Sequence, residues 1–190
     1  MSVVIFLRHA ETTANEQGLV SGRSFETDLT EYGIKQAHLA GERLVVHSES
    51  IAFVVSSGLT RTNHTAHIVN KGLNKKVICD ARLQEKHHGD YDGASWEVVE
   101  EVIKKIEDDQ CPHFGGESGD SFRERIVESM CEYLHREEEM ILVVSHGYVG
   151  GVLTKSFFGA EKYFGNAEHI IFDPAEIPNL SGICALYMEI

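Results

Sequence analysis

The sequence has 190 residues, of which 42% are hydrophobic and 25% are charged, a composition typical of a globular chain and not of a disordered or fibrous one. Its 30 acidic and 17 basic side chains give a net charge of −13, which repels nucleic acid and does not favour anionic membranes. No apolar stretch approaches the roughly 18–20 residues of a membrane span, and no basic region precedes an apolar run at the N-terminus. We therefore expect a single domain over residues 1–190, a cytoplasmic location, and neither nucleic acid nor a membrane as partner.

Short apolar runs typical of buried strands recur along the chain. They are Val3–Leu7, Ala52–Val55, Lys76–Cys79 and Met140–Val144. Segments with apolar residues at helical spacing lie between them, at residues 34–44 with Thr30 as cap, 65–69, 96–106 and 122–134. Strands that alternate with amphipathic helices predict an α/β fold, with a mostly parallel central sheet covered on both faces.

The chain beyond Gly159 has a weaker pattern, until Ile183–Ile190 predicts a last strand at a sheet edge. The stretch CPHFGGESGD, Cys111–Asp120, predicts a surface loop between two helices. The cysteines are widely scattered and form no C-x-x-C pair, which predicts reduced thiols in preference to disulfides or a zinc site. They are Cys79, Cys111, Cys131 and Cys184.

Three predicted strands end in residues suited to phosphate chemistry, within FLRHAE, VVSSGLTR and LVVSHG. Because ligands bind outside the carboxyl ends of strands in an open α/β sheet, we expect these residues along one edge. They are Arg8, His9, Arg61 and His146. Guanidinium groups match phosphoryl oxygens, and a neutral imidazole held at one ring nitrogen can attack phosphorus through the other. A carboxylic acid must then protonate the departing oxygen.

Six sequence blocks carry a family resemblance: LRHAETTAN, SGRSFETDLTEYGIKQA, SSGLTRTNHTA, RLQEKHHGDYDG, GGESGDSFRER and VSHGYVGG. In this order, from Val3 to about Gly159, they resemble the histidine phosphatase superfamily, the phosphoglycerate-mutase-like family, in its branch with a glutamate acid. The resemblance implies that family's three-layer α/β/α fold and a metal-independent phosphomonoesterase without a cofactor. Its substrate would be a small phosphorylated metabolite.

The resemblance also implies roles for individual residues. His9 would be the phosphorylated nucleophile and Glu85 the proton donor. The phosphate would be held by Arg8, Asn15, Arg61, His146 and Gly147. Further candidates for substrate contact are Ser21, Gly22, Arg23 and Lys86.

Some alternatives stay open at this point. Asp90 and Asp92 lie close to Glu85 in the chain, and only the L-x-E-x-x-x-G spacing favours Glu85 as the acid. The block EKHHG resembles the mutase members of the family more than the phosphatase members. The interval between Glu85 and His146, in contrast, is short compared with that of the mutases, which favours hydrolysis. A phosphoglycerate-type phosphomutase is therefore the second hypothesis, and a non-catalytic phosphate-binding protein the third. Substrate identity and oligomeric state have no signal in the sequence.

Histidine pairs elsewhere in the chain raise the question of a metal site. His64 and His67 lie three residues apart, and His87 and His88 lie beside Asp90. Neither pair belongs to a recognised ligand signature, so we expect ordinary surface histidines and no metal site.

Overall fold

A computed structural model describes residues 1–105 and 115–188. At its centre is a five-stranded sheet in the order β3-β2-β4-β1-β5. The strands are β1 (Val3–Arg8), β2 (Ile51–Ser56), β3 (Lys76–Cys79), β4 (Met140–Ser145) and β5 (His169–Phe172). All neighbouring pairs are parallel except β1 with β5, which are antiparallel. The predicted α/β fold with a mostly parallel sheet is confirmed.

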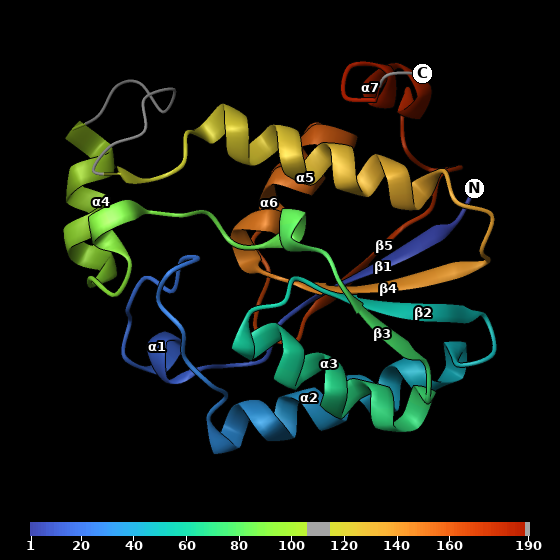
Figure 1. The fold of residues 1–190 in the computed structure, drawn as a ribbon, viewed down its shortest axis with the longest axis horizontal. Helices are drawn as coiled ribbons and strands as arrows, with labels where there is room; N and C mark the ends of the chain where they lie inside the picture. Colours follow the sequence, from blue (N-terminus) through green and yellow to red (C-terminus); the bar gives the residue numbers. More distant parts are fainter. Residues whose placement is uncertain (106–114, 189–190) are drawn as a thin grey trace.

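Helices cover both faces of the sheet (Figure 1), with α5 and α6 on one side and α2 and α3 on the other. The α-helices are α1 (Thr13–Glu16), α2 (Glu31–Leu44), α3 (Thr60–Leu73), α4 (Trp96–Lys105), α5 (Gly119–Leu134), α6 (Gly147–Phe158) and α7 (Leu180–Ala185). Short 3₁₀ helices in the described residues include η1 (Val45–His47), η2 (Ala81–Leu83) and η3 (Gly89–Tyr91). As predicted, Thr30 caps α2, since its hydroxyl oxygen accepts the backbone N–H of Gly33 at 2.9 Å.

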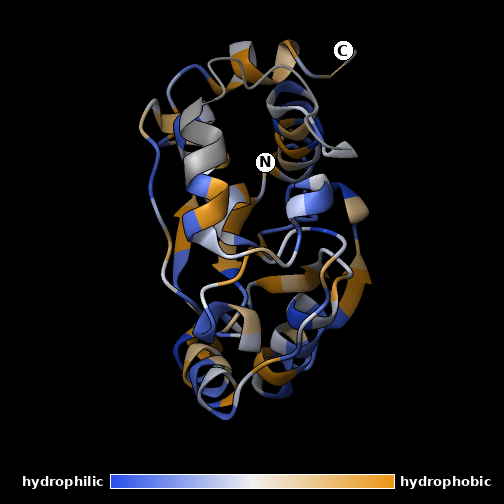
Figure 2. Ribbon diagram, turned by 90° about the vertical axis from the view of Figure 1, so that its left-hand side faces the viewer, coloured by the Kyte–Doolittle hydropathy of each residue, from blue (hydrophilic) through white to orange (hydrophobic). Residues whose placement is uncertain are grey.

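Two hydrophobic clusters lie on opposite faces of the sheet. Successive side chains of a strand point to opposite faces, so Phe6 of β1 packs in the cluster that includes Ile126 of α5. Its neighbour Ile5 packs in the cluster that includes Val69 of α3. Figure 2 shows strands that are mostly hydrophobic, whereas the helices carry both hydrophobic and hydrophilic residues. This pattern is expected for a sheet buried between two helical layers.

The strand register aligns the carboxyl ends that matter for function. Arg8 at the end of β1 lies opposite Ser145 at the end of β4, and Ser56 at the end of β2 lies opposite Val144. The residues that follow these strands therefore meet at one edge of the sheet. Figure 1 shows α1 and α4 beyond that edge.

The C-terminal region differs from the sequence prediction in two respects. The fifth strand is β5, which was not predicted, and the predicted strand Ile183–Ile190 is wrong because its first three residues are the second half of α7 and residues 186–188 form turns and a bend. Residues 189–190 lie outside the described residues. Leu180 and Cys184 are buried at helical spacing, and a short apolar run does not by itself distinguish a buried strand from a buried helix.

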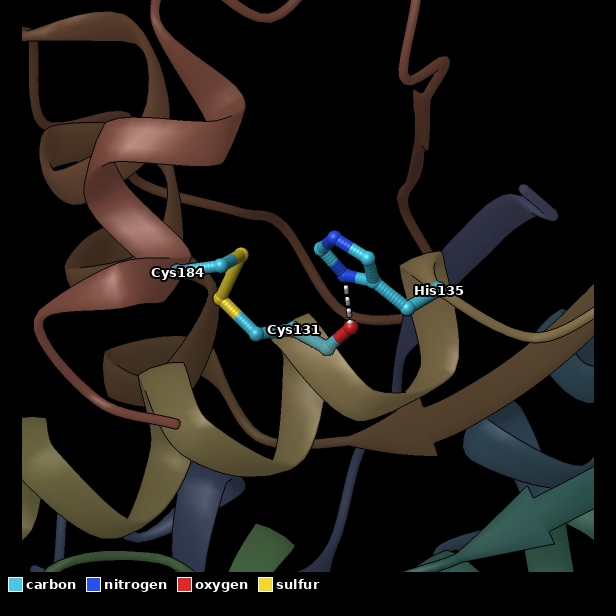
Figure 3. The surroundings of a disulfide bond; sticks show 3 residues. All are labelled: Cys131, His135 and Cys184. Atoms are coloured by element: carbon cyan, nitrogen blue, oxygen red, sulfur yellow. Dashed lines mark hydrogen bonds between the residues drawn. A yellow bond between two sulfur atoms is a disulfide. The ribbon is translucent and has the colours of Figure 1, made fainter. Parts of the chain in front are cut away.

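A disulfide between Cys131 of α5 and Cys184 of α7 contradicts the prediction of reduced thiols (Figure 3). The two residues are 53 positions apart, and their Cα atoms lie 5.6 Å from each other. Sequence spacing gave no signal because only the packing of α7 on α5 brings them together. Cys79 is an exposed free thiol, and Cys111 lies outside the described residues.

The remaining expectations concern α4 and the loop after it. α4 ends at Lys105, and position 106, the end of the predicted helix, lies outside the described residues. So do positions 111–114 of the predicted loop, whereas its last two residues belong to α5, capped by the Ser118 hydroxyl. No helix in the described part of the chain is long and apolar enough to cross a membrane.

Candidate active site

A cavity of about 550 Å³ lies at the carboxyl edge of the sheet. Its size is typical of a small-molecule site. Seven of the predicted catalytic, phosphate-binding and substrate-contact residues line it: Arg8, His9, Asn15, Ser21, Glu85, Lys86 and Gly147. Arg61 and His146 do not line the cavity themselves; they are fully buried directly behind Ser21 and His9 and form the inner layer of its polar floor.

His9 is fixed in a form suited to nucleophilic attack. Its backbone N–H donates to the carbonyl of Ser145 at 2.8 Å, and its side chain is only 4% exposed. Nδ1 lies 2.7 Å from the carbonyl oxygen of Ala10, so Nδ1 carries the proton and Nε2 keeps its lone pair. Burial, reinforced by the guanidinium groups of Arg61 and Arg8, lowers the pKa of His9 well below its usual 6.5. The ring is therefore neutral at neutral pH.

Arg61 lies in the first turn of α3 and has no exposed surface. Its Nη2 donates to the carbonyl oxygens of Ser21 at 2.9 Å and Gly22 at 3.1 Å. Its Nη1 is buried and has no hydrogen-bond partner among the described residues. An unsatisfied buried guanidinium donor is costly, so Nη1 is a candidate donor to an anionic ligand, and the phosphate contact expected from the sequence stays a prediction.

His146 holds Arg61 in place. It is the N-cap residue of α6 and is fully buried. Its Nδ1 accepts from Nε of Arg61 at 3.3 Å, so its proton is on Nε2, which lies 2.8 Å from Oγ of Ser57 and donates to it. Burial and the Arg61 charge lower the pKa of His146 well below 6.5. Both ring nitrogens already contact the protein, so the direct phosphate contact expected from the sequence stays a prediction.

Arg8 and Gly147 bring further donors to the same floor. Nη1 of Arg8 donates to the carbonyl of Phe164, whereas its Nε is buried without a hydrogen-bond partner in the described part of the chain. Gly147 begins α6, and a Cβ at this position would lie 3.1 Å from Nε of Arg8. Glycine therefore lets the guanidinium approach the N-terminus of the helix, where unpaired backbone N–H groups favour an anion.

Glu85 has the properties of a proton donor. Its carboxylate accepts the backbone N–H of Lys86 at 3.0 Å and that of Tyr148 at 3.3 Å. Burial raises its pKa above the ordinary 4.5, although these hydrogen bonds and the charges of Arg61 and Arg8 oppose the shift. A raised pKa keeps part of the carboxyl groups protonated in mildly acidic solution.

The two competing aspartates are placed differently. Neither Asp90 nor Asp92 lines the cavity. Asp90 is exposed, and Asp92 accepts the backbone N–H groups of Ser24 at 2.9 Å and His88 at 3.2 Å. The geometry therefore favours Glu85 over both as the acid.

Arg125 of α5 holds the segment that carries Glu85, a contact that sequence reasoning missed. Nη1 of Arg125 donates to the carbonyls of Arg82 and Gln84, the latter at 2.7 Å, and Nη2 donates to that of Glu85 at 3.2 Å. The carboxylate of Glu117 accepts from Nε at 2.7 Å and from Nη2 at 2.8 Å. No local spacing signals this arrangement, because the carbonyls lie about 40 residues before the arginine.

Asn15 and Ser21 both line the cavity. Oδ1 of Asn15 accepts the backbone N–H of Thr12 and the side-chain amide of Asn166, each at 3.1 Å. Its amide nitrogen remains to donate to a ligand. The hydroxyl of Ser21 donates to the carbonyl of Phe25 at 3.2 Å. Ser21 contributes to the site through its backbone carbonyl, which accepts from the guanidinium of Arg61.

The other predicted substrate contacts divide into two groups. Gly22 does not line the cavity, and a Cβ there would approach the carbonyl oxygen of Lys86 to 2.8 Å. Arg23 does not line it either, and its Nη2 pairs with Glu117 at 3.3 Å. Lys86 lines the cavity, with Nζ lying 5.7 Å from the ring centroid of Tyr148. The structure thus brings only Lys86 of these three into the cavity.

The histidine pairs form no metal site within residues 1–105 and 115–188, where no group of three or more His, Cys, Asp or Glu side chains could hold an ion. His64 instead pairs with Asp28, at 2.6 Å between Nδ1 and Oδ1. His87 and His88 differ from the expectation of ordinary surface histidines because both line the cavity.

Comparison with known proteins agrees with the fold and identifies the family of the chain. A family profile described as histidine phosphatase superfamily (branch 1) matches residues 4–181. The chain therefore belongs to the histidine phosphatase superfamily, as the sequence blocks predict.

Named relatives include phosphatases and mutases. The chain is 33% identical over 156 residues to a metal-independent phosphoserine phosphatase of Arabidopsis thaliana, with 77% of this chain and 64% of that protein covered. It is 30% identical over 171 residues to a probable phosphoglycerate mutase of Yersinia enterocolitica, with 84% and 76% covered. The chain spans between 48% and 64% of the length of three phosphatase relatives that it matches.

A solved structure of a mycobacterial glucosyl-3-phosphoglycerate phosphatase is also similar to this chain. The TM-score is 0.76 at 26% identity, with 90% of this chain and 89% of that chain covered.

Proposed function

We propose that this chain hydrolyses phosphate monoesters through a covalent phosphohistidine at His9. The observation that carries the proposal is the buried, neutral imidazole beside two guanidinium groups, of Arg8 and Arg61, whose buried N–H donors lack partners among the described residues. Such donors match the oxygens of a phosphoryl group, and the lone pair on Nε2 is directed away from the Ala10 carbonyl that fixes the ring. Membership of the superfamily and the phosphatase names of relatives support the same activity.

In the first half-reaction Nε2 of His9 attacks phosphorus, and the bond from phosphorus to the alcohol oxygen breaks. Glu85 donates its proton to the departing oxygen, so that a neutral alcohol leaves. The phosphorylated imidazole gains positive charge, which the hydrogen bond from Nδ1–H to the carbonyl of Ala10 stabilises. Arg61 and Arg8 balance the charge on the phosphoryl oxygens.

In the second half-reaction the Glu85 carboxylate takes a proton from water, and the water oxygen attacks phosphorus. The bond between phosphorus and Nε2 breaks, which restores the neutral imidazole of His9 and releases inorganic phosphate. Each group returns to its starting protonation state, so the cycle requires neither a metal nor a cofactor.

Assay of an activated aryl phosphate in the presence of a chelator tests the proposal. We expect turnover that the chelator does not reduce. Loss of all activity in chelator, with recovery on addition of a divalent ion, contradicts the mechanism. If no ester is hydrolysed although inorganic phosphate or vanadate binds, the chain is a phosphate-binding protein and not an enzyme.

A phosphoglycerate-type mutase is the second candidate, because similar proteins include a probable phosphoglycerate mutase. A mutase must bind a bisphosphorylated ligand and retain the phosphoryl group on the enzyme. Only Arg8 and Lys86 supply lysine or arginine charge among the described residues that line the cavity, which favours hydrolysis. Incubation with phosphoglycerate and bisphosphoglycerate separates the two candidates, since a mutase yields the isomeric phosphoglycerate and a phosphatase yields inorganic phosphate.

A further inference from the structure

The cavity extends beyond the phosphate floor into a region walled by apolar side chains. From this wall we propose that the site selects phosphate monoesters whose alcohol part is uncharged and apolar, an inference that rests on the proposed hydrolase activity. The wall is formed by Leu19, Val20, Tyr91, Trp96, Val99 and Tyr148. Apolar surface that a ligand removes from water contributes to binding roughly in proportion to its area.

Backbone hydrogen bonds build this wall before any ligand binds. The segment after α1 pairs with the segment before α4: Val20 N–H donates to the Ala94 carbonyl at 2.8 Å, and Gly93 N–H donates to the Val20 carbonyl at 2.8 Å. Trp96 N–H donates to the Gly18 carbonyl at 3.0 Å. Because these contacts do not involve substrate, an apolar group would enter a surface that is already formed.

Tyr148 belongs to the wall and also contacts Glu85. Its backbone N–H binds the Glu85 carboxylate, and its ring stacks on that of Phe122, with centroids 5.1 Å apart and planes inclined by 22°. The ring of a leaving group held against Tyr148 would therefore lie close to the acid that protonates its oxygen. Burial of apolar surface favours an aromatic or bulky alkyl group here.

The charges around the cavity oppose a second anionic group on the substrate. Apart from Arg8 in the phosphate floor, Lys86 is the one lysine or arginine that lines the cavity among the described residues, and its ammonium lies over Tyr148. Glu161 also lines the cavity, as does Glu117, whose carboxylate is paired with Arg125 and Arg23. Carboxylate charge in the cavity would repel a carboxylate or second phosphate on the alcohol part, and Lys86 alone would attract it. Substrates with a second anionic group should therefore bind less well.

Three esters of primary alcohols test this proposal: ethyl phosphate, 2-phenylethyl phosphate and 3-phosphoglycerate. The first two differ mainly in the phenyl group, so their comparison isolates apolar contact from leaving-group acidity. We expect kcat/KM to be roughly 10- to 100-fold higher for 2-phenylethyl phosphate than for ethyl phosphate, as burial of one phenyl group predicts. 3-Phosphoglycerate should not exceed ethyl phosphate.

Two variants of α4 locate the source of the preference. Trp96→Ala should reduce the ratio of phenylethyl to ethyl rates by roughly 3- to 10-fold. Val98→Ala is the matched control, since Val98 lies on the same helix, is 50% exposed and does not line the cavity, and it should leave the ratio unchanged.

The outcomes separate the two proposals. If activated aryl and alkyl phosphates are all inert, the hydrolase function fails, and the selectivity fails with it. If the esters are hydrolysed but ethyl phosphate or 3-phosphoglycerate is as good a substrate as 2-phenylethyl phosphate, the selectivity is wrong while the function stands. A preference that Trp96→Ala does not reduce, or that Val98→Ala reduces equally, also overturns the assignment of the wall.

Discussion

The floor and the wall of the cavity are built in different ways. The floor consists of side chains directly after parallel strands or in the first turn of a helix, such as His9 and Arg61, which are 4% and 0% exposed. The wall comes from irregular segments and from α4, and its Trp96 is 45% exposed. Since the floor meets the phosphoryl group and the wall meets the alcohol, changes in the floor should slow every ester, and changes in the wall should alter only the ratio between esters.

The largest effect on the floor is expected from His9→Ala. Removal of the nucleophile should reduce kcat by on the order of 10⁴–10⁶ for alkyl and aryl esters alike. His67→Ala, at an exposed position of α3, is the control and should have wild-type activity. Steady-state rates for both variants and both ester types check this prediction, and substantial turnover by His9→Ala would show that the nucleophile is another group.

Glu85→Gln should produce a defect that depends on the leaving group. Without the acid, alkyl esters should lose on the order of 10²–10⁴ in kcat/KM, because an alkoxide is a poor leaving group. An activated aryl phosphate should lose much less, since its phenolate departs unprotonated. Equal losses for the two esters, with phosphorylation shown to limit the rate, would argue against Glu85 as the acid.

The pH profile of alkyl ester hydrolysis gives a second test of the roles of His9 and Glu85. The nucleophile is active above the pKa of His9, which burial lowers from 6.5, and activity is lost as pH falls through it. The acid is active below the pKa of Glu85, which burial raises from 4.5, and activity is lost as pH rises through it. The profile of kcat/KM should therefore lose its descending limb in Glu85→Gln, and a limb that persists unchanged in the variant would contradict the assignment.

Arg61→Ala should reduce kcat/KM by on the order of 10²–10³ for every ester, as expected for the loss of a preorganised donor to the phosphoryl group. Arg61→Lys keeps the charge but cannot reproduce the guanidinium contacts to Ser21, Gly22 and His146, so it should rescue little. Kinetics with both esters check the prediction, with circular dichroism to confirm folding. A defect confined to alkyl esters would instead show that Arg61 assists Glu85 in protonating the leaving group.

Arg125→Gln should have the smallest effect, on the order of 10-fold, because it acts by positioning Glu85. Its defect should share the leaving-group dependence of Glu85→Gln, and the double variant should be no worse than Glu85→Gln alone. A merely structural role would lower the melting temperature and slow both ester types equally. If the rate losses of Arg125→Gln and Glu85→Gln are additive in the double variant, Arg125 does not act by positioning Glu85.

How much the sequence could predict follows the same division between floor and wall. His9 and His146 each follow an apolar run after a single intervening residue, so strand periodicity and the rule for carboxyl ends are enough to bring them to one edge. The strands β1 to β4 and the helices α2 to α5 are predictable for the same reason, because each depends on the spacing of apolar residues within a short segment, whereas β5 and α6 were not predicted. The resemblance to a family then suggested roles for these residues.

The wall could not be predicted because its contacts join distant parts of the chain. The pairing of Leu19 with Ser95 cannot be recognised from local spacing. The same is true, outside the wall, of the hydrogen bond from Arg125 to the carbonyl of Glu85. The disulfide of Cys131 and Cys184 has the same origin, since it depends on how α7 packs on α5. Short segments such as α7 are also ambiguous between helix and strand.

Rapid-quench analysis of the phosphoenzyme tests the central claim most directly. An aryl phosphate labelled in its phosphoryl group should give a burst of phenolate and, in the same interval, an acid-labile phosphoryl label on the protein. Peptide mapping should place the label on His9, and His9→Ala should carry none. A label on another residue, or one that persists in His9→Ala, would contradict the account.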